Sequence, residues 1–441
     1  MGEHESDTTT VTIEGLGFLG EGFVQLEPGR FVSVPHTLPG DEVVVRPGPW
    51  RRGRAWAEVV RWVRRAPEHH NPQCHHYDTC SGCALRHMSH EHERRWKEEQ
   101  LRQILGRYGP PGASSVPLDW VDAGERLGHR ARGSFRVGEA GALTLGLRST
   151  RVDGSLADVR DCPAQSERFR ALMTRVADVL ETHGRAGVEQ VGIWTCEETG
   201  MARVVVQVGS TSTRLPWKEP LRALTGGASV EVIVTGEEGE IDRWGPAWRV
   251  RVAPGVEVEA PLGSWLHATP RVARLLGRWV TQRLRGHARV LDLCCGLGTM
   301  TFRLAAQAEH VIAVDEDYHG CMALQRAATR AGMHIEVRPG RVGQALRKLR
   351  RELHDKPRPT AAVINPMRRP LGEGQLSELA ALGVRHALYL GPSPVSAARD
   401  ARVMAEMGFT ITRAAGVNLH PATGQVMLAL ELSLHGSSGG A

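Results

Sequence analysis

Hydrophobic and polar positions alternate with a period of two along the first part of the chain. Over residues 11–66 this alternation is interrupted by turn-forming residues at 27–29, 39–40 and 52–53. Short alternating segments joined by tight turns are typical of a small antiparallel barrel. We therefore predict a compact all-β domain over residues 9–66.

The pattern then becomes helical. Residues 91–108, EHERRWKEEQLRQILGRY, carry apolar and aromatic positions among charges, which predicts an exposed amphipathic helix. Short apolar strands such as ARVVVQVGS and a predicted helix at 166–183 follow. They indicate an α+β middle domain over residues 67–262, from which helix 91–108 could depart to pack on the C-terminal domain.

From residue 263 onward, helices alternate with short apolar segments. The segments are ARVLDL, HVIAVD, AAVIN, HALYL and VMLALEL. Uniformly apolar strands between helices are the pattern of a largely parallel sheet covered on both faces. We predict a Rossmann-like α/β domain over residues 263–435 and a disordered tail, GSSGGA, at 436–441. The expected fold class is thus multidomain, with an OB-like barrel, an α+β region and an α/β domain.

Composition changes this picture little. The chain has 441 residues, of which 41% are hydrophobic, and no apolar run long enough to span a bilayer. Its first residues, MGEHESDTTT, are polar and acidic, so we expect a cytoplasmic protein without a membrane partner. The net charge of +6 is carried by arginine, which suits phosphate, although an arginine-rich codon preference explains it equally well. The oligomeric state is left open.

Four cysteines have the spacing of a metal site. Cys74, Cys80 and Cys83 form C-x5-C-x2-C, and Cys162 follows at a distance. Clustered cysteines in a cytosolic chain are more often metal ligands than disulfides, and sites made only of thiolates suit zinc or an iron-sulfur cluster. Three ligands in one irregular loop and Pro163 directly after the fourth favour iron. Paired C-x2-C motifs would have suited zinc better.

The neighbouring histidines and the remaining thiols are weaker candidates. His75, His76 and His87 could ligate a metal, but a loop this rich in histidine is also well suited to solvent. Cys196 and Cys321 have no partner pattern, and we expect both to be core residues.

The segment VLDLCCGLGTM predicts a nucleotide-type cofactor loop. A strand ends in Asp292, and a loop with Gly296 and Gly298 opens a helix, so a cofactor can approach the backbone closely. The next strand ends in Asp315, where a carboxylate can bind ribose hydroxyls, and a third ends in Asn365 at the same edge. The glycine spacing is not G-x-G-x-x-G, so S-adenosylmethionine fits better than a dinucleotide. A sheet without a ligand, with glycines that only form turns, is the alternative.

These features together resemble one family, the RNA uracil-5-methyltransferases that carry a TRAM module and a [4Fe-4S] cluster. GLGFLGEGFVQLEPGRFVSVPHTLPGDEVVV is similar to a TRAM barrel, which holds RNA, and the four cysteines fall on the four cluster ligands of the family. LDLCCGLGT matches its cofactor loop, and LYLGPSPVSAARDARVMAEMGF matches a segment that reads YVSCNPATLARDL in the family. The resemblance covers nearly the whole chain and implies rRNA or tRNA as partner.

The residues that do the chemistry in that family are replaced here. The family adds a cysteine thiolate to carbon 6 of uracil, and a carboxylate then removes the proton from carbon 5. In this register the nucleophile position is Pro392 and the base position is Met427. The family F-x-Q-x-N has become WLHAT, which puts His267 at the glutamine. The family D-P-P-R has become NPMR, which puts Asn365 at the aspartate.

A substitute nucleophile would have to come from the cofactor loop. Cys295 matches an ordinary cysteine of the family, so Cys294 is the single added thiol. We expect Cys294 to pack as a core residue rather than to react.

RNA contact is most plausible along PGPWRRGRAWAEVVRWVRR, residues 47–65, where tryptophans interleave with arginines. Aromatic rings stack on bases, and guanidinium groups hold phosphate. The six-residue spacing of the tryptophans puts them on one strand face, which could equally be the barrel core. The candidate RNA contacts are Trp50, Arg51, Arg52, Arg54 and Trp56.

Three functions compete at this point. The first is an RNA-binding member of the family that holds the cluster and has lost uracil-5 methylation. The second is an active S-adenosylmethionine-dependent RNA methyltransferase with altered chemistry, for example methylation of an amino group held by Asn365-Pro366. The third is a redox-sensing or iron-sensing module that uses the cluster.

Overall fold

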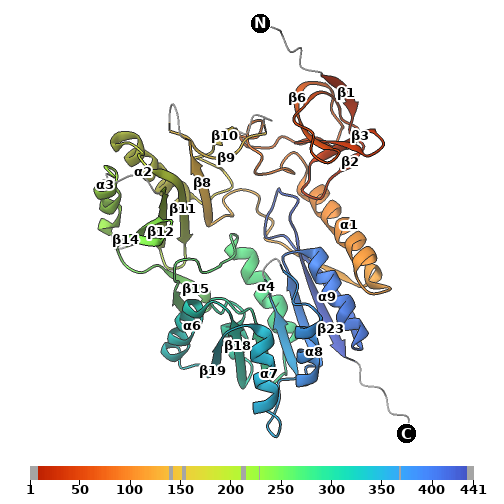
Figure 1. Ribbon diagram of the computed structural model, residues 1–441, viewed down its shortest axis with the longest axis vertical. Coiled ribbons are helices and arrows are strands. Elements are labelled where there is room, and N and C mark those ends of the chain that lie inside the picture. The colour runs from red at the N-terminus through yellow and green to blue at the C-terminus, as the bar shows by residue number, and fades with distance from the viewer. Residues whose placement is uncertain are drawn as a thin grey trace.

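The computed structural model describes residues 8–138, 143–150, 155–209, 215–227, 229–366 and 369–434. The predicted tail at 436–441 lies outside the described residues. Three larger sheets follow one another along the chain, and the N-terminal sheet sits apart from the other two at the upper end of the molecule (Figure 1).

The N-terminal sheet has six strands in the order β1-β5-β6-β4-β3-β2. Its inward positions are mainly valines, as expected for strands with one buried face. The longest strand, β6, pairs antiparallel with β5 and parallel with β4, and two register shifts against β5 bend the sheet around the valine core. The strands are β1 (Thr9–Thr12), β2 (Gly15–Leu16), β3 (Gly22–Glu27), β4 (Arg30–Val34), β5 (Glu42–Pro47) and β6 (Arg54–Arg64).

A seven-stranded sheet forms the middle of the molecule, in the order β10-β9-β8-β11-β12-β13-β14. Helix α2 (Glu167–His183) covers it and confirms the helix predicted at 166–183; Phe169 and Val176 on its buried face pack on the sheet. The strands are β8 (Arg132–Val137), β9 (Leu145–Arg148), β10 (Leu156–Asp158), β11 (Val188–Cys196), β12 (Met201–Val208), β13 (Val230–Gly236) and β14 (Gly239–Trp244). The short helices α3 (Lys218–Arg222) and η2 (Ala223–Gly227) and the hairpin of β15 (Arg249–Ala253) and β16 (Val256–Glu259) complete this region.

The C-terminal sheet has eight strands in the order β19-β18-β17-β20-β21-β23-β22-β7. The five strands from β19 to β21 are parallel, which confirms the predicted α/β arrangement, and β23 is antiparallel to β21. All five apolar segments identified in the sequence are strands here. The strands are β7 (Leu118–Val121), β17 (Arg289–Leu293), β18 (His310–Asp315), β19 (Ile335–Pro339), β20 (Ala361–Ile364), β21 (His386–Gly391), β22 (Phe409–Val417) and β23 (Met427–Leu434).

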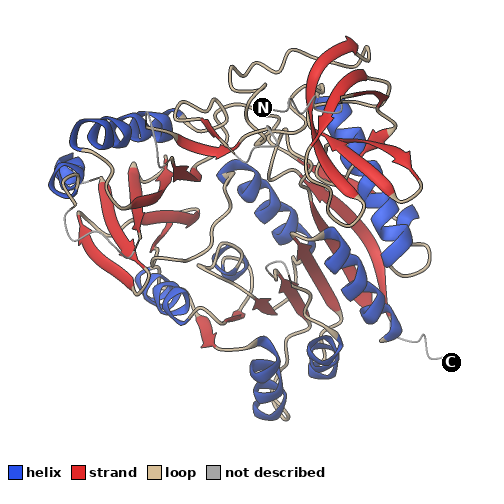
Figure 2. Ribbon diagram, turned by 45° about the horizontal axis from the view of Figure 1, so that its top comes forward, coloured by secondary structure: helices blue, strands red, loops and turns tan. Residues whose placement is uncertain are grey.

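Helices cover both faces of this sheet (Figure 2). Leu291 and Leu293 of β17 point to the face packed by α1, α7, α8 and α9, whereas Val290 points to the face packed by α4 and α5. This alternation lets each parallel strand bury both of its sides. The helices are α4 (Pro270–Arg283), α5 (Thr301–Ala305), α6 (Tyr318–Arg330), α7 (Val342–Glu352), α8 (Glu373–Leu382) and α9 (Pro394–Glu406).

Helix α1 (His90–Tyr108) lies beside α9, a helix about 300 residues later in the chain (Figure 1). After the short helix η1 (Ala113–Ser115), strand β7 pairs in parallel with β22 and completes the C-terminal sheet. The prediction of an exposed helix is wrong for one face of α1. Leu101, Ile104 and Leu105 are buried in the core of that sheet, and so are two charged residues, Glu93 and Lys97.

The side chains of Glu93 and Lys97 are both 0% exposed, and their opposite charges pair with each other. The ammonium of Lys97 donates to the Glu93 carboxylate at 2.6 Å and to the Asn418 Oδ1 atom at 2.8 Å. The Glu93 carboxylate also accepts the backbone N–H of Ala422 at 2.9 Å and pairs with Arg126 at 3.0 Å. Burial is tolerated because each charge meets an opposite charge and several hydrogen bonds. This network holds α1 against the chain between β22 and β23.

Within the ranges given above, no helix combines the length and the apolar character needed to cross a membrane.

Replacing Lys97 with Met should lower the free energy of unfolding by about 3–5 kcal/mol, because the Glu93 carboxylate would stay buried without its ammonium partner. Replacing Arg95 with Met is the matched control on the same helix. Its ion pair with Glu91 is exposed, so the loss should be below about 1 kcal/mol. Urea denaturation of both variants measures the difference, and equal losses would contradict the role of the buried pair.

Candidate functional site

A cavity of about 350 Å³ opens at the carboxyl ends of β17, β18, β20 and β21. Parallel strands end at one edge of their sheet, so the loops that follow them meet there. Nine residues named in the sequence analysis line this cavity. They are His267, Asp292, Cys294, Cys295, Gly296, Asp315, Asn365, Pro366 and Pro392.

The loop after β17 is shaped by its glycines. Gly296 and Gly298 have φ angles of +53° and +86°, a region that favours glycine. A Cβ atom on Gly298 would lie 2.9 Å from side-chain atoms of Phe302 and Leu324, so only glycine fits. Gly298 does not line the cavity; it lets the loop turn tightly into the following helix. Gly296 does line the cavity and leaves backbone accessible there.

Two carboxylates fix this loop in place. Asp315 accepts the backbone N–H of Gly296 at 2.8 Å through one oxygen and that of Asp317 at 2.8 Å through the other. Asp292 is buried and accepts a hydrogen bond from the Thr301 hydroxyl at 2.6 Å, while none of the described residues forms a hydrogen bond with its Oδ1 atom. Burial raises the pKa of Asp292 to about 7, and the charge of Asp315 adds to this rise. A ligand that donates a hydrogen bond to Oδ1 would complete the site.

His267 is neutral at physiological pH. Burial and the positive charge of Arg132 lower the pKa of His267 to about 3. Its ring lies 4.4 Å from the ring of Trp265 in an edge-to-face arrangement, and the guanidinium of Arg132 lies 5.6 Å from the same tryptophan. A neutral imidazole can donate one hydrogen bond and accept another, as the family glutamine can.

The two catalytic positions of the family have different surroundings. Pro392 follows β21 and lines the cavity, where it presents no nucleophile. Met427 is the first residue of β23, is 2% exposed and packs in the core beside Val417 and Ala429. Met427 is not among the residues that line the cavity.

Cys294 does not behave as a simple core residue. It packs against the core of the sheet as predicted, but it also lines the cavity and adopts a φ of +60°. Burial raises the pKa of its thiol to about 12, with further increases from the charges of Asp315 and Asp292. Cys196 and Cys321 are both buried, which confirms the sequence prediction.

The four clustered cysteines line a second, smaller cavity of about 70 Å³. Burial raises the pKa of Cys74 and Cys162, and raises that of Cys80 to about 12; the nearby thiols contribute to each rise. Donors are already directed at two of the sulfurs. The Gly82 N–H donates to Cys80 Sγ at 3.3 Å, and the Arg86 guanidinium donates to Cys83 Sγ at 3.6 Å.

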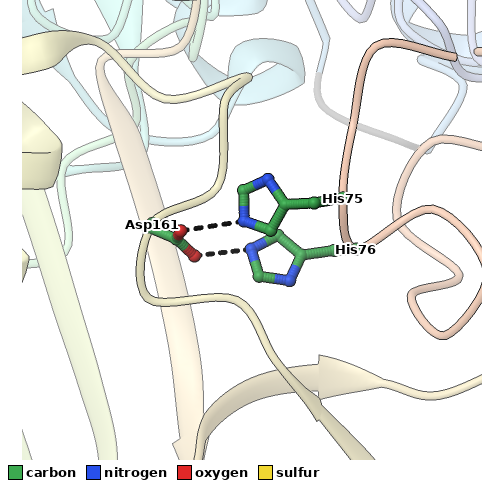
Figure 3. A group of neighbouring side chains, drawn as sticks. All are labelled: His75, His76 and Asp161. Carbon is green, nitrogen blue, oxygen red and sulfur yellow. Dashed lines mark hydrogen bonds and ion pairs between the residues drawn. The ribbon is translucent and has the colours of Figure 1, made fainter.

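A histidine pair joins the two segments that carry these cysteines (Figure 3). The Nε2 atoms of His75 and His76 lie 2.8 and 2.6 Å from the two carboxylate oxygens of Asp161, the residue before Cys162. These three side chains could hold a metal ion, since their ligand atoms lie within 4.8 Å of one another. Their hydrogen bonds already tie the loop after Cys74 to the turn before Cys162.

The candidate RNA contacts lie at one end of the N-terminal sheet. Arg51, Arg52 and Arg54 are exposed in the turn that leads into β6, and no salt bridge is found for them among the described residues. The tryptophans do not share one exposed face. Trp50 and Trp62 pack against the valine core, whereas Trp56 is 46% exposed. The register shifts of β6 and the position of Trp50 before the strand explain the difference.

Comparison with known proteins adds to this geometry. No family model matches the chain. The chain is 29% identical to an uncharacterized RNA methyltransferase of Caulobacter vibrioides, over 92% of this chain and 95% of that protein. It is also 29% identical to the 23S rRNA (uracil(1939)-C(5))-methyltransferase RlmD of Halomonas elongata, over 96% and 89%. The chain is a homologue of RNA methyltransferases.

The fold of this RNA methyltransferase homologue is shared with a solved structure. The tRNA (uracil-54, C5)-methyltransferase of Pyrococcus abyssi, in complex with S-adenosyl-L-homocysteine, matches with a TM-score of 0.74 and 18% identity, over 96% of this chain and 99% of that one. The resemblance to RNA uracil-5-methyltransferases predicted from the sequence is confirmed.

In this RNA methyltransferase homologue, sequence reasoning did not identify several of the residues that line the cavity of about 350 Å³. These are Leu262, Gly263, Trp265, Leu266, Leu297, Thr299, Met300 and Asp317. Trp265 and Leu266 are neighbours of His267, so proximity in sequence was a usable signal. Leu262 and Gly263 carried no such signal, because they precede the motif in an irregular segment.

The raised pKa of Asp292 predicts a pH dependence of stability. The folded protein holds this proton up to about pH 7, whereas the unfolded chain loses it near pH 4, so stability falls as pH rises between these values. In Asp292→Asn the penalty is absent, and Thr301 can still donate to the amide oxygen. The variant should therefore gain relative to wild type by up to about 3 kcal/mol between pH 5 and pH 8. Thermal unfolding without ligand measures the gain; a constant difference would contradict it.

Proposed function

We propose that this chain is an RNA-binding member of the S-adenosylmethionine-dependent RNA uracil-5-methyltransferase family that holds a [4Fe-4S] cluster and does not methylate carbon 5 of uracil. The observation that carries the proposal is Pro392. It lines the cavity formed by the cofactor loop, at the position where the family places its nucleophile.

The size of the effect follows from the chemistry. Loss of a covalent nucleophile costs on the order of a million-fold in a serine protease, and a general base contributes roughly a hundred-fold to ten-thousand-fold. Cys294 does not restore the nucleophile. With a pKa of about 12, only about one thiol in 10⁵ is ionised at pH 7. Met427 has no basic group and is buried away from the cavity.

The cavity still fits S-adenosylmethionine. The backbone is accessible at Gly296, Asp315 is oriented by two amides, and Asp292 has an unsatisfied buried oxygen. In this proposal Asp315 binds ribose hydroxyls and the neutral His267 takes the place of the family glutamine. The cofactor, when bound, would supply an electrophilic methyl group beside Asn365.

The cysteine cavity fits a cluster by its donor set. Four thiols converge from two segments, and the pKa values of Cys74, Cys80 and Cys162 are raised because each ionised sulfur would be buried near other thiols. A cationic centre removes that penalty, and N–H groups directed at sulfur are favourable for bound thiolates. Cys74, Cys80, Cys83 and Cys162 would ligate the cluster.

RNA is the partner in this proposal, as rRNA or tRNA. Residues 9–66 would act as a TRAM barrel, residues 67–262 would carry the cluster, and residues 263–435 would form the methyltransferase domain. The exposed arginines beside Trp56 give the barrel a positively charged end suited to phosphate.

Methylation of an amino group is the second candidate, because Asn365 and Pro366 line the cofactor cavity. An asparagine side chain there can accept a hydrogen bond from a planar amine. Methylation of such an amine needs no covalent nucleophile. The remainder of this motif, Met367 and Arg368, lies outside the described residues.

Incubation of the purified protein with total RNA and labelled S-adenosylmethionine should give no 5-methyluridine above background, because both catalytic groups are missing. The label recovered in 5-methyluridine measures this in the purified system. In cells, the corresponding measurement is mass spectrometry of rRNA and tRNA nucleosides with and without the gene. Loss of 5-methyluridine on deletion would refute the proposal. Loss of a methylated amino group would support the second candidate instead.

Cys80→Ser should lower the iron and sulfide bound after anaerobic reconstitution to well under half of the wild-type amount, since one of four ligands is lost. The control is Cys196→Ser, because Cys196 is buried away from the cysteine cavity. Iron content and the visible absorption of the cluster measure the effect. Equal iron in both variants would contradict the assignment of Cys80.

A further inference from the structure

A third cavity, of about 930 Å³, lies where the N-terminal sheet meets the loop of clustered cysteines. We call it the junction cavity. Its lining comes partly from the N-terminal region, with His36, Val59 and Trp62, and partly from Tyr77 and His87 of the cysteine loop. It is separate from the cavity of about 350 Å³ at the strand ends, which we call the methyl-donor cavity. Among the described residues, none lines both.

Two buried imidazoles of this cavity each have one nitrogen without a hydrogen bond. His36 is 8% exposed and His87 is 1% exposed, and no hydrogen-bond partner for either Nε2 atom is found among the described residues. Burial lowers the pKa of His36 to about 4. Burial, together with the nearby His69 imidazole and the Arg126 guanidinium, lowers the pKa of His87 to about 2. Both rings are therefore neutral. An unsatisfied buried polar atom is costly unless a ligand completes it.

The tautomer of His87 follows from its neighbour. The Tyr77 hydroxyl lies 2.5 Å from Nδ1 of His87, and burial keeps the pKa of Tyr77 well above its usual value, so the hydroxyl donates. Nδ1 is then the acceptor, and Nε2 carries the proton. His87 thus offers an N–H donor for which no well-formed hydrogen bond is found among the described residues, although the Thr37 backbone lies nearby.

Aromatic rings surround these imidazoles. His36 stacks on Tyr77 at 4.0 Å with an interplanar angle of 20°, and His69 stacks on His87 at 5.0 Å. Trp62 packs edge-on against His69 at 5.4 Å, and the guanidinium of Arg65 lies 4.5 Å from Trp62. A flat, polar-edged molecule fits such walls, because its faces meet rings and its edge meets N–H and carboxylate groups.

A metal ion fits the junction cavity less well. Among the described residues, the single group of three histidine, cysteine or carboxylate ligands within 4.8 Å of one another is the His75, His76 and Asp161 cluster outside this cavity. The imidazoles of His36 and His87 have ring centroids 6.4 Å apart, and His69 is already bonded to Asp41 at 2.8 Å. The arrangement therefore favours hydrogen bonding to an organic ligand.

We propose that the junction cavity takes an unpaired base of the bound RNA strand. This rests on the proposed RNA binding and assigns it a pocket. Exposed Arg61 and Arg65 on the adjoining end of β6 can hold the phosphates of a strand whose base enters the cavity. Tyr77 also lines the cysteine cavity, so the segment that would ligate the cluster forms one wall of the base pocket.

The test compares two fluorescein-labelled 12-nucleotide strands, one of mixed sequence with all its bases and one with abasic ribose at every position. The cluster-loaded full chain should bind the strand with bases about fivefold to a hundredfold more tightly, the range for stacking of one base. Thr79→Trp, which fills the cavity from its exposed rim, should remove most of this preference. His36→Phe, which keeps a ring against Tyr77 but removes the Nε2 atom, should reduce it.

The matched control is the triple replacement of Arg51, Arg52 and Arg54 by Ala, outside the cavity. It should weaken binding of both strands and reduce the dependence on salt, with the preference for bases retained. An unchanged preference in Thr79→Trp and His36→Phe would overturn the pocket while leaving RNA binding intact. Absence of binding to either strand would overturn the proposed function itself. Full competition by millimolar mononucleotides would show a free nucleotide as ligand and overturn the assignment to a strand.

Discussion

The buried ion pair between Glu93 and Lys97 is the constraint on which the arrangement of this molecule depends. Taking two charges out of water is costly, and it is tolerated only where geometry gives each charge several partners. Here those partners come from remote parts of the chain. Lys97 bonds Asn418, Glu93 bonds the backbone of Ala422, and Arg126 adds a second cation. The pair therefore fixes helix α1 and the chain between β22 and β23 together.

The same network reaches the cysteine loop and the methyl-donor cavity. The Arg126 guanidinium donates to the backbone carbonyls of Leu85 and Met88, which follow the third cysteine. Thr269 lies two residues after His267 in the sequence, and its hydroxyl donates to the carbonyl of Leu419 at 2.7 Å. Leu419 follows Asn418 directly, so this bond connects the network to the methyl-donor cavity. Loss of the ion pair would therefore change the backbone contacts at both the cysteine loop and the methyl-donor cavity.

The three cavities differ in the chemical groups that line them and therefore in the ligands that they suit. The methyl-donor cavity offers backbone groups and a carboxylate of raised pKa, which suits a cofactor rich in hydrogen-bond donors. The cysteine cavity gathers thiols whose ionisation is unfavourable without a cation. The junction cavity presents neutral imidazoles and aromatic faces. Tyr77 lies between the last two, so RNA contact and the proposed cluster would share one loop.

The sequence by itself determined the local elements and the grouping of residues at strand ends. Parallel strands are buried on both faces and appear as apolar runs, so β17, β18, β20 and β21 were predictable, and Asp292, Asp315 and Asn365 were expected at one edge. The antiparallel strand β23 was predictable for the same reason, because it is also an apolar run. The tertiary structure alone decided that β7 pairs with β22 and that α1 buries two charges. It also decided that Met427 lies in the core rather than in the cavity lining, and that His36 lies close to His87. Each of these depends on contacts between segments far apart in the chain. Periodicity shows which face of an element is apolar, but it does not show which distant partner covers that face or neutralises a charge on it.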